Sequence, residues 1–299
     1  MKKILLIAAA LVIATVGGCS KDSGSGSDYT AASTASTASD GSTVTIAASG
    51  ESSNDEKPDQ TDNSGSNGND YYNDMPNETS TDGTTGKVSG TSKVQTVTEA
   101  KADTSVSDSG VTITKPTTIT KDGTYIVTGK INGQIYVTAK DVTLILNGAE
   151  ITNSGAPAIL GEYGNGKQTL TITLKGTNII NGGTHGIQGK DKLVINGEGA
   201  VSVSAVKDGL HGGASLKIDG GNIDIIKSYE GMESPKITLN NGNVRIYADD
   251  DGMNAATDDK TVVPEIIING GYLELYSNSD GIDSNGTITI AGGVVAVFN

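Results

Sequence analysis

The chain has 299 residues, a formal net charge of −14 at neutral pH, no tryptophan and one cysteine. This acidic balance argues against direct binding of nucleic acid, because no basic surface is available to neutralise phosphates. A single cysteine excludes an intrachain disulfide.

The N-terminus has the organisation of an export signal. Met1-Lys2-Lys3 precedes an apolar run over 4–16, and Val16-Gly17-Gly18-Cys19 has the pattern of a lipobox. We predict a lipoprotein signal peptide over 1–19, lipidation of Cys19, and anchoring to the outer face of the bacterial cell membrane. The alternative is an ordinary secretory signal in which the cysteine is incidental.

Residues 20–105 are rich in Ser, Thr, Gly, Asn and Asp, and Ile46 is their one isoleucine. Such a segment cannot bury enough apolar surface to offset the conformational entropy lost on folding. We predict a disordered linker with a mean reach of about 50 Å. A folded domain is then expected over 106–299.

Short runs of alternating aliphatic residues fill this domain, and none of its windows shows the periodicity of an amphipathic helix. The sequence therefore predicts an all-β fold, whose strands include Val111–Ile113, Tyr125–Val127, Ile135–Val137, Val142–Leu146, Leu170–Leu174, Leu193–Ile195 and Val201–Val203.

A repeat runs through the second half of the chain. Its glycines are separated by 23, 22, 21 and 29 residues, and an aliphatic residue follows each one, at His185-Gly186-Ile187, Asp208-Gly209-Leu210, Glu230-Gly231-Met232, Asp251-Gly252-Met253 and Asp280-Gly281-Ile282. A period of 20–30 residues with glycine turns predicts a solenoid of stacked β-coils. We expect about seven coils, with insertions near 161–168 and 255–265 emerging as loops.

Stacking would bring residues at one phase of the repeat about 4.8 Å apart, the spacing of neighbouring strands. Two such columns are polar. The first is His185, Asp208, Glu230, Asp251 and Asp280, and the second is Gln188, His211, Glu233, Asn254 and Asp283.

Two carboxylates at this spacing repel by about 3 kcal/mol at an effective dielectric constant near 20. A cation, raised pKa values or side chains turned into water must relieve that repulsion. Carboxylate, amide and carbonyl oxygens favour Ca²⁺, whereas the spacing does not fit an EF-hand, which would place Tyr247 at its first position. The alternative is a set of solvated turn residues, because Asp-Gly favours turns.

Other polar positions have structural interpretations. We expect a column of turn residues to form a hydrogen-bonded ladder without a function, namely Asn147, Asn196, Asp219, Asn240 and Asn269. Arg245, the chain's one arginine, is expected to face solvent. Tyr229, beside Glu230, is the preferred aromatic residue for stacking on a sugar.

The lipobox, the polar linker and the motifs Asp250-Asp251-Gly252-Met253-Asn254 and Ser279-Asp280-Gly281-Ile282-Asp283 resemble the clostridial-type, calcium-binding, carbohydrate-binding β-helix family. The resemblance covers about 106–299. It implies a right-handed parallel β-helix similar to pectate lyases, and binding of acidic polygalacturonan and cellulose. It also implies calcium ligands at Asp208, Glu230, Asp250, Asp251, Asn254, Asp280 and Asp283.

Three functions are compatible with these patterns. Polysaccharide binding through calcium, with Tyr229, Glu233 and His211 contacting the ligand, is favoured. A calcium-dependent lyase would need a base, for which Lys207 and Lys227 are the candidates. A structural surface adhesin stabilised by calcium is the third. Because the two columns begin with His185 and Gln188 in place of carboxylates, the assignment of calcium is doubtful at that level.

Overall fold

The computed structural model describes residues 92–105, 108–164 and 167–298, and in these ranges every regular element is a β-strand. The predicted signal peptide, Cys19 and residues 20–91 of the predicted linker lie outside the described residues. Among the described residues there is no helix long and apolar enough to cross a membrane.

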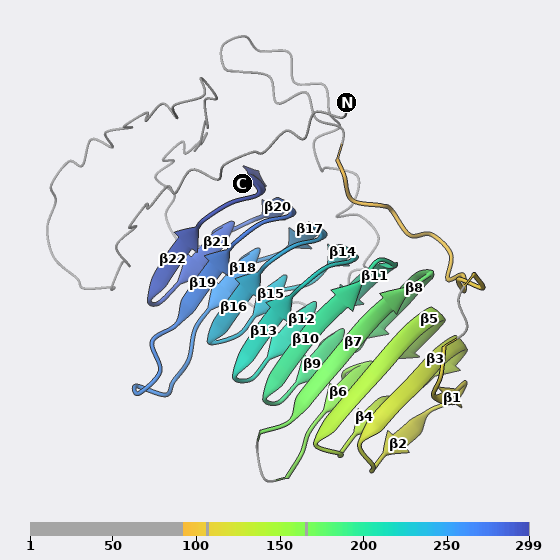
Figure 1. Cartoon of the computed structure of the whole chain (residues 1–299). Coiled ribbons are helices and arrows are strands. Elements are labelled where there is room, and N and C mark those ends of the chain that lie inside the picture. Colours follow the sequence, from red (N-terminus) through yellow and green to blue (C-terminus); the bar gives the residue numbers. More distant parts are fainter. Residues whose placement is uncertain (1–91, 106–107, 165–166, 299) are drawn as a thin grey trace, which may run out of the picture. The chain divides into compact units, whose positions relative to one another are not determined.

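Parallel strands stack into a β-helix (Figure 1). One side is an eight-stranded parallel sheet of short strands, one for each coil. In spatial order these strands are β2 (Thr117–Ile119), β4 (Ile135–Val137), β6 (Ile159–Gly161), β9 (Ile187–Gly189), β12 (Leu210–Gly212), β15 (Met232–Glu233), β18 (Met253–Ala255) and β21 (Ile282–Ser284).

The other two sides belong to one sheet that divides at a long strand, β5 (Asp141–Asn153). The first half of β5 leads into one arm: β7 (Thr169–Lys175), β10 (Lys192–Gly197), β13 (Ser215–Ile218), β16 (Lys236–Leu239), β19 (Glu265–Ile268) and β22 (Thr287–Ile290). Its second half leads into the other arm: β8 (Thr177–Gly182), β11 (Ala200–Ala205), β14 (Asn222–Lys227), β17 (Asn243–Ala248), β20 (Tyr272–Ser277) and β23 (Val294–Phe298).

The N-terminal coil is completed by β3 (Gly123–Asn132), which pairs with β5, and by β1 (Val111–Ile113), which pairs with β3. All seven strands predicted from alternation lie within strands of the structure. The eight strands of the short sheet give one coil more than the seven expected. The described residues of both predicted insertions form loops, at 162–164 and 167–168 between β6 and β7 and at 256–264 between β18 and β19.

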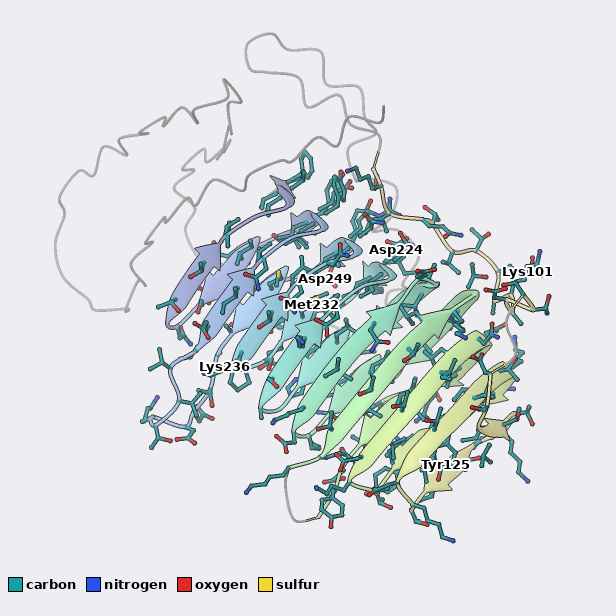
Figure 2. All side chains as sticks on the ribbon, viewed as in Figure 1. Lys101, Tyr125, Asp224, Met232, Lys236 and Asp249 are labelled. Atoms are coloured by element: carbon teal, nitrogen blue, oxygen red, sulfur yellow. The ribbon has the colours of Figure 1, made fainter. Side chains whose placement is uncertain are left out.

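The core is a column of aliphatic side chains enclosed by the three sides. Along β7 the residues alternate between buried and half-buried positions, as expected for strands that cover a core with one face. Met232, labelled in Figure 2, lies in register between Leu210 and Met253 of the adjacent coils and is 1 % exposed. Each coil therefore packs its aliphatic residues directly on those of the next.

Glycines serve two different needs in this stack. Turn glycines such as Gly221, at φ 98°, adopt a backbone conformation that other residues rarely reach. The glycines of the repeated motif lack positive φ. They are required because other atoms of the stack lie too close to leave room for a Cβ. A Cβ atom on Gly231 would lie 2.4 Å from the carbonyl oxygen of Gly252 and 2.2 Å from a methyl group of Ile246.

We predict that Gly231→Ala lowers the free energy of unfolding by about 2 kcal/mol, because neighbouring coils must separate to admit the methyl group. Gly155→Ala is the matched control, since its Cβ would meet nothing within 4 Å. Chemical denaturation of both variants measures the difference. Equal stability of the two variants would contradict the proposed role of close approach.

Residues 92–105 depart from the linker prediction. Lys101 forms an antiparallel bridge with Thr177 of β8, with two backbone hydrogen bonds of 2.8 Å, and the side chains of Val94 and Val97 are buried. This segment is ordered against the β-helix, so the prediction of disorder to residue 105 is corrected for these 14 residues. It escaped prediction because it adds one isolated bridge and has no repeat.

Arg245 is also placed differently from the prediction. Its guanidinium donates two hydrogen bonds, of 3.0 and 2.7 Å, to the carboxylate of Asp224, and a third to the hydroxyl of Thr96. The side chain of Asp224 is 0 % exposed and that of Arg245 is 14 % exposed. Arg245 therefore compensates a buried charge on β14 and does not face open solvent.

We expect Arg245→Met to cost about 3 kcal/mol of unfolding free energy, because it leaves the Asp224 carboxylate buried without its charged partner. The double variant Arg245→Met/Asp224→Val should recover much of that loss, since neither charge then remains. Thermal and urea unfolding of the two variants test this. A double variant as unstable as the single one would show that packing, and not charge burial, dominates.

Candidate functional site: a polar column along one turn

The turns that lead from the second arm of the large sheet into the short sheet carry the first predicted column. The first four motif glycines each donate a backbone hydrogen bond of 2.9–3.0 Å to the carbonyl of the residue that precedes the motif glycine of the next coil. These bonds run from Gly186 to Asp208, Gly209 to Glu230, Gly231 to Asp251 and Gly252 to Asp280. The column predicted from the sequence is therefore present and continuous.

The second column lies at the start of the short sheet. Its members are direct partners in the parallel register, as Gln188–His211, His211–Glu233, Glu233–Asn254 and Asn254–Asp283. Polar residues that are 20–30 residues apart in sequence thus become neighbours in space.

Two groups of carboxylates have oxygens within 4.8 Å of one another. The first is Asp208, Glu230 and Glu233, and the second is Glu230, Asp250 and Asp251. Glu230 belongs to both groups and lies at the centre of the acidic part of the column. Asp280 and Asp283, in the last coil, are in neither group, although the Asp280 amide donates to the Asp251 carboxylate at 2.9 Å.

Glu230 and Asn254 have unused acceptors. The Asn254 amide donates to Oε1 of Glu230 at 3.0 Å. Oε2 of Glu230 and Oδ1 of Asn254 are both buried and have no hydrogen-bond partner among the described residues. Two buried oxygens without a donor, beside two further carboxylates, suit a hard cation.

The carboxylates of this cluster repel one another. Burial, together with the charges of Glu233, Asp208 and Asp251, raises the pKa of Glu230 to about 7 despite the hydrogen bond from Asn254. Burial and the charges of Asp250 and Asp283 also raise the pKa of Asp251. In the absence of an ion, these raised pKa values favour the protonated forms of Glu230 and Asp251, which reduces the repulsion.

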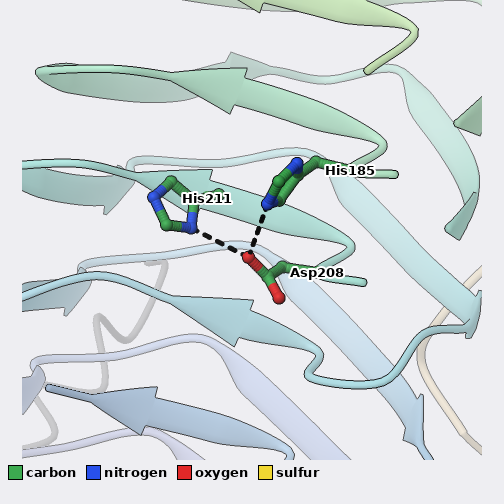
Figure 3. A group of neighbouring side chains, drawn as sticks. All are labelled: His185, Asp208 and His211. Atoms are coloured by element: carbon green, nitrogen blue, oxygen red, sulfur yellow. Dashed lines mark hydrogen bonds and ion pairs between the residues drawn. The ribbon is translucent and has the colours of Figure 1, made fainter. Parts of the chain in front are cut away.

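The other end of the column is built differently (Figure 3). Oδ2 of the buried Asp208 lies 3.1 Å from Nε2 of His185 and 2.8 Å from Nδ1 of His211. Nδ1 of His211 is also 3.2 Å from the Glu233 carboxylate. Burial lowers the pKa of His211, but hydrogen bonds to Asp208 and Glu233 outweigh that effect and raise it to about 9.

Asp208 shows the opposite shift. Although burial acts to raise the pKa of Asp208, the hydrogen bonds from His185 and His211 lower it well below its usual range. Sequence reasoning assigned His185 no role. The available signal was that the chain has only two histidines, which occupy these two columns in consecutive coils.

The remaining predicted residues lie around the column. Tyr229 is 52 % exposed, and a hydrogen bond to Asp250 raises the pKa of its phenol. Lys207 is exposed one coil before Tyr229, and its carbonyl accepts the Tyr229 amide at 2.8 Å. Lys227 is exposed at the end of β14. Their proposed roles stay predictions.

The turn ladder is present in part. Asn240 donates to Asp219 at 2.6 Å and Asn269 donates to Asn240 at 2.7 Å, whereas Asn147 bonds to the backbone of Asp103.

Outside the turns, the rings of Tyr247, Tyr276 and Phe298 stack with centroids 4.7 Å apart, which favours packing over ligand binding for these tyrosines.

A comparison with protein families matches the family described as carbohydrate-binding domain-containing protein, over residues 110–164 and 165–263. The chain belongs to this family. The match includes the column from His185 to Asn254 and ends before Asp280 and Asp283. No protein with a curated description matches the chain significantly.

A comparison with solved structures finds the polysaccharide lyase-like protein from C. thermocellum, determined as a gadolinium derivative. It is 22 % identical to this chain, with a TM-score of 0.47, and the alignment covers 63 % of this chain and 92 % of that one.

The pKa shifts predict how stability depends on pH in the presence of a chelator. Glu230 has a raised pKa, so its contribution is present below pH 4.5 and is lost as the pH rises to about 7. His211 also has a raised pKa, so its contribution is present below pH 6.5 and is lost as the pH rises through about 9. Stability should therefore fall from pH 4.5 to 9.

Urea unfolding at a series of pH values measures this profile. Glu230→Gln should remove the fall in stability between pH 4.5 and 7 and leave the fall above pH 7 unchanged. A wild-type stability that rises over the whole range would show that the column does not hold these protons.

Proposed function

We propose that this domain binds an acidic polysaccharide of the polygalacturonan type through calcium ions held along the polar column. The observation that carries the proposal is the cluster around Glu230, where buried oxygens of Glu230 and Asn254 have no donor and two more carboxylates lie close by. Membership of a carbohydrate-binding family supports the choice of ligand class.

Calcium would be held by Glu230, Asp250, Asp251 and Asn254, and toward the C-terminus by Asp280 and Asp283. Asp208 is held by two histidines, so the proposal is centred on Glu230. The ion would supply positive charge between protein carboxylates and the carboxylates of the polymer.

Overall charge supports this use of a cation. A chain with a net charge of −14 repels an acidic polymer unless an ion lies between them. Tyr229 is exposed beside the cluster and can place an aromatic ring against a sugar. We further propose that the domain acts on the outside of the bacterial cell, anchored through the lipid on Cys19.

Lyase activity is the second candidate. It rests on the same cluster and on Lys207 or Lys227 as the base that removes a proton next to the uronate carboxylate. A structural adhesin, in which calcium only stabilises the coils, is the third. Cellulose is an alternative polymer for the binding function.

Retention of the full-length chain on immobilised polygalacturonate, with calcium or with a chelator, separates these functions. We expect retention with calcium only, no ultraviolet-absorbing unsaturated product, and thermal stabilisation by calcium of about 3 kcal/mol at a hundredfold excess over the dissociation constant. Glu230→Gln should abolish both effects. Asp258→Asn, in the exposed loop after β18, is the matched control.

Each other outcome identifies a different function. Product formation that Lys207→Ala or Lys227→Ala abolishes would establish the lyase. Stabilisation by calcium without retention on polygalacturonate or cellulose would establish the structural role. Neither stabilisation nor retention would overturn the proposal altogether.

A further inference from the structure

The histidine end of the column has a chemistry that the calcium proposal does not use. The chain has only two histidines, and the stacking of two coils brings both against the same carboxylate oxygen, Oδ2 of Asp208 (Figure 3). The two imidazole rings lie with centroids 5.1 Å apart and planes 65° from each other. They therefore approach Asp208 from different directions.

The distances are close to those of a tetrahedral metal centre. Ligand atoms that lie about 2.0–2.1 Å from a tetrahedral ion are about 3.3–3.4 Å from one another. The contacts from Asp208 to His185 and His211 are 3.1 and 2.8 Å, and that from His211 to Glu233 is 3.2 Å. The ligand atoms of His185, Asp208 and His211 all lie within 4.8 Å of one another, so small side-chain movements would admit an ion among them.

The donor set decides which ion fits. Two imidazole nitrogens and one carboxylate are ligands of zinc and related transition metals, whereas calcium takes oxygen ligands almost exclusively. Asp208 is 4 % exposed, and the side chains of His185 and His211 are 14 % and 20 % exposed. The ligands are thus largely fixed by packing, and the half-buried histidines leave a path for an ion.

We propose that His185, Asp208 and His211 form a second metal site, which binds a divalent transition ion of the zinc class. Glu233, or a water molecule, completes the coordination. Asp208 and Glu233 also lie within 4.8 Å of Glu230, but the site takes a different ion and does not use Glu230 as a ligand, so its occupancy can be tested separately from the proposed function. One polar column then has a nitrogen-rich end for zinc and an oxygen-rich end for calcium.

The chain offers a direct test, because two histidines give only two sets of imidazole resonances. The full-length chain, labelled with ¹⁵N-histidine, is titrated with zinc chloride and, separately, with calcium chloride. We expect one equivalent of zinc to shift the resonances of Nε2 in His185 and Nδ1 in His211 together. Calcium should leave the resonances of both ring nitrogens unshifted at concentrations that saturate the Glu230 cluster.

Variants connect these shifts to the site. His185→Gln and His211→Gln should each weaken zinc binding, measured by calorimetry, by about tenfold or more. Asp258→Asn, in the exposed loop after β18, is the matched control and should bind zinc as the wild type does. Amide spectra of every variant establish that it is folded.

Three results would overturn the proposal. Imidazole resonances that stay unchanged with excess zinc would show that the two histidines serve only to neutralise Asp208. Zinc binding that survives in both folded histidine variants would place the ion elsewhere. Displacement of zinc by equimolar calcium would show an oxygen site. None of these results bears on calcium binding at Glu230, so the two proposals fail separately.

Discussion

The in-register stacking of parallel coils is the constraint on which the rest of the structure depends. Each coil satisfies its backbone by hydrogen bonding to the coils above and below, so every side chain inherits a fixed neighbour one strand spacing away. The first four motif glycines maintain this register, because a carbonyl oxygen of the adjacent coil lies within 2.8 Å of the place where a Cβ would be. Aliphatic residues gain a continuous core from this arrangement, whereas acidic residues gain repulsion.

The molecule meets that repulsion in different ways along one turn. At the N-terminal end of the column, Asp208 is paired with one histidine of its own coil and one of the preceding coil. Further along, Glu230 lies among carboxylates, and its pKa rises to about 7. On the outer face of β14, Asp224 is buried against Arg245. The charge of a buried acid is thus offset in three ways: by an imidazole ring at Asp208, by a raised pKa at Glu230 and by a guanidinium at Asp224.

Much of this architecture could be predicted from the sequence, because the repeat fixes both the strands and the columns. The periodic glycines and alternating aliphatics gave the strands, both insertions and the neighbours of Glu230 correctly. Features that do not repeat could not be found in this way. The segment 92–105 adds a single bridge, and Arg245 pairs with an acid one coil away whose burial no periodicity reveals. Handedness and the roles of the site residues stay predictions.

The core and the polar column occupy different positions of the repeat. Within each coil, the aliphatic residues that stabilise the fold are therefore distinct from the polar residues that can bind a ligand. Substituting the two polar positions of one coil changes the ligand atoms offered at that level and leaves its aliphatic positions, and those of its neighbours, as they were. The ion that each coil prefers can therefore change during evolution without a change in the fold.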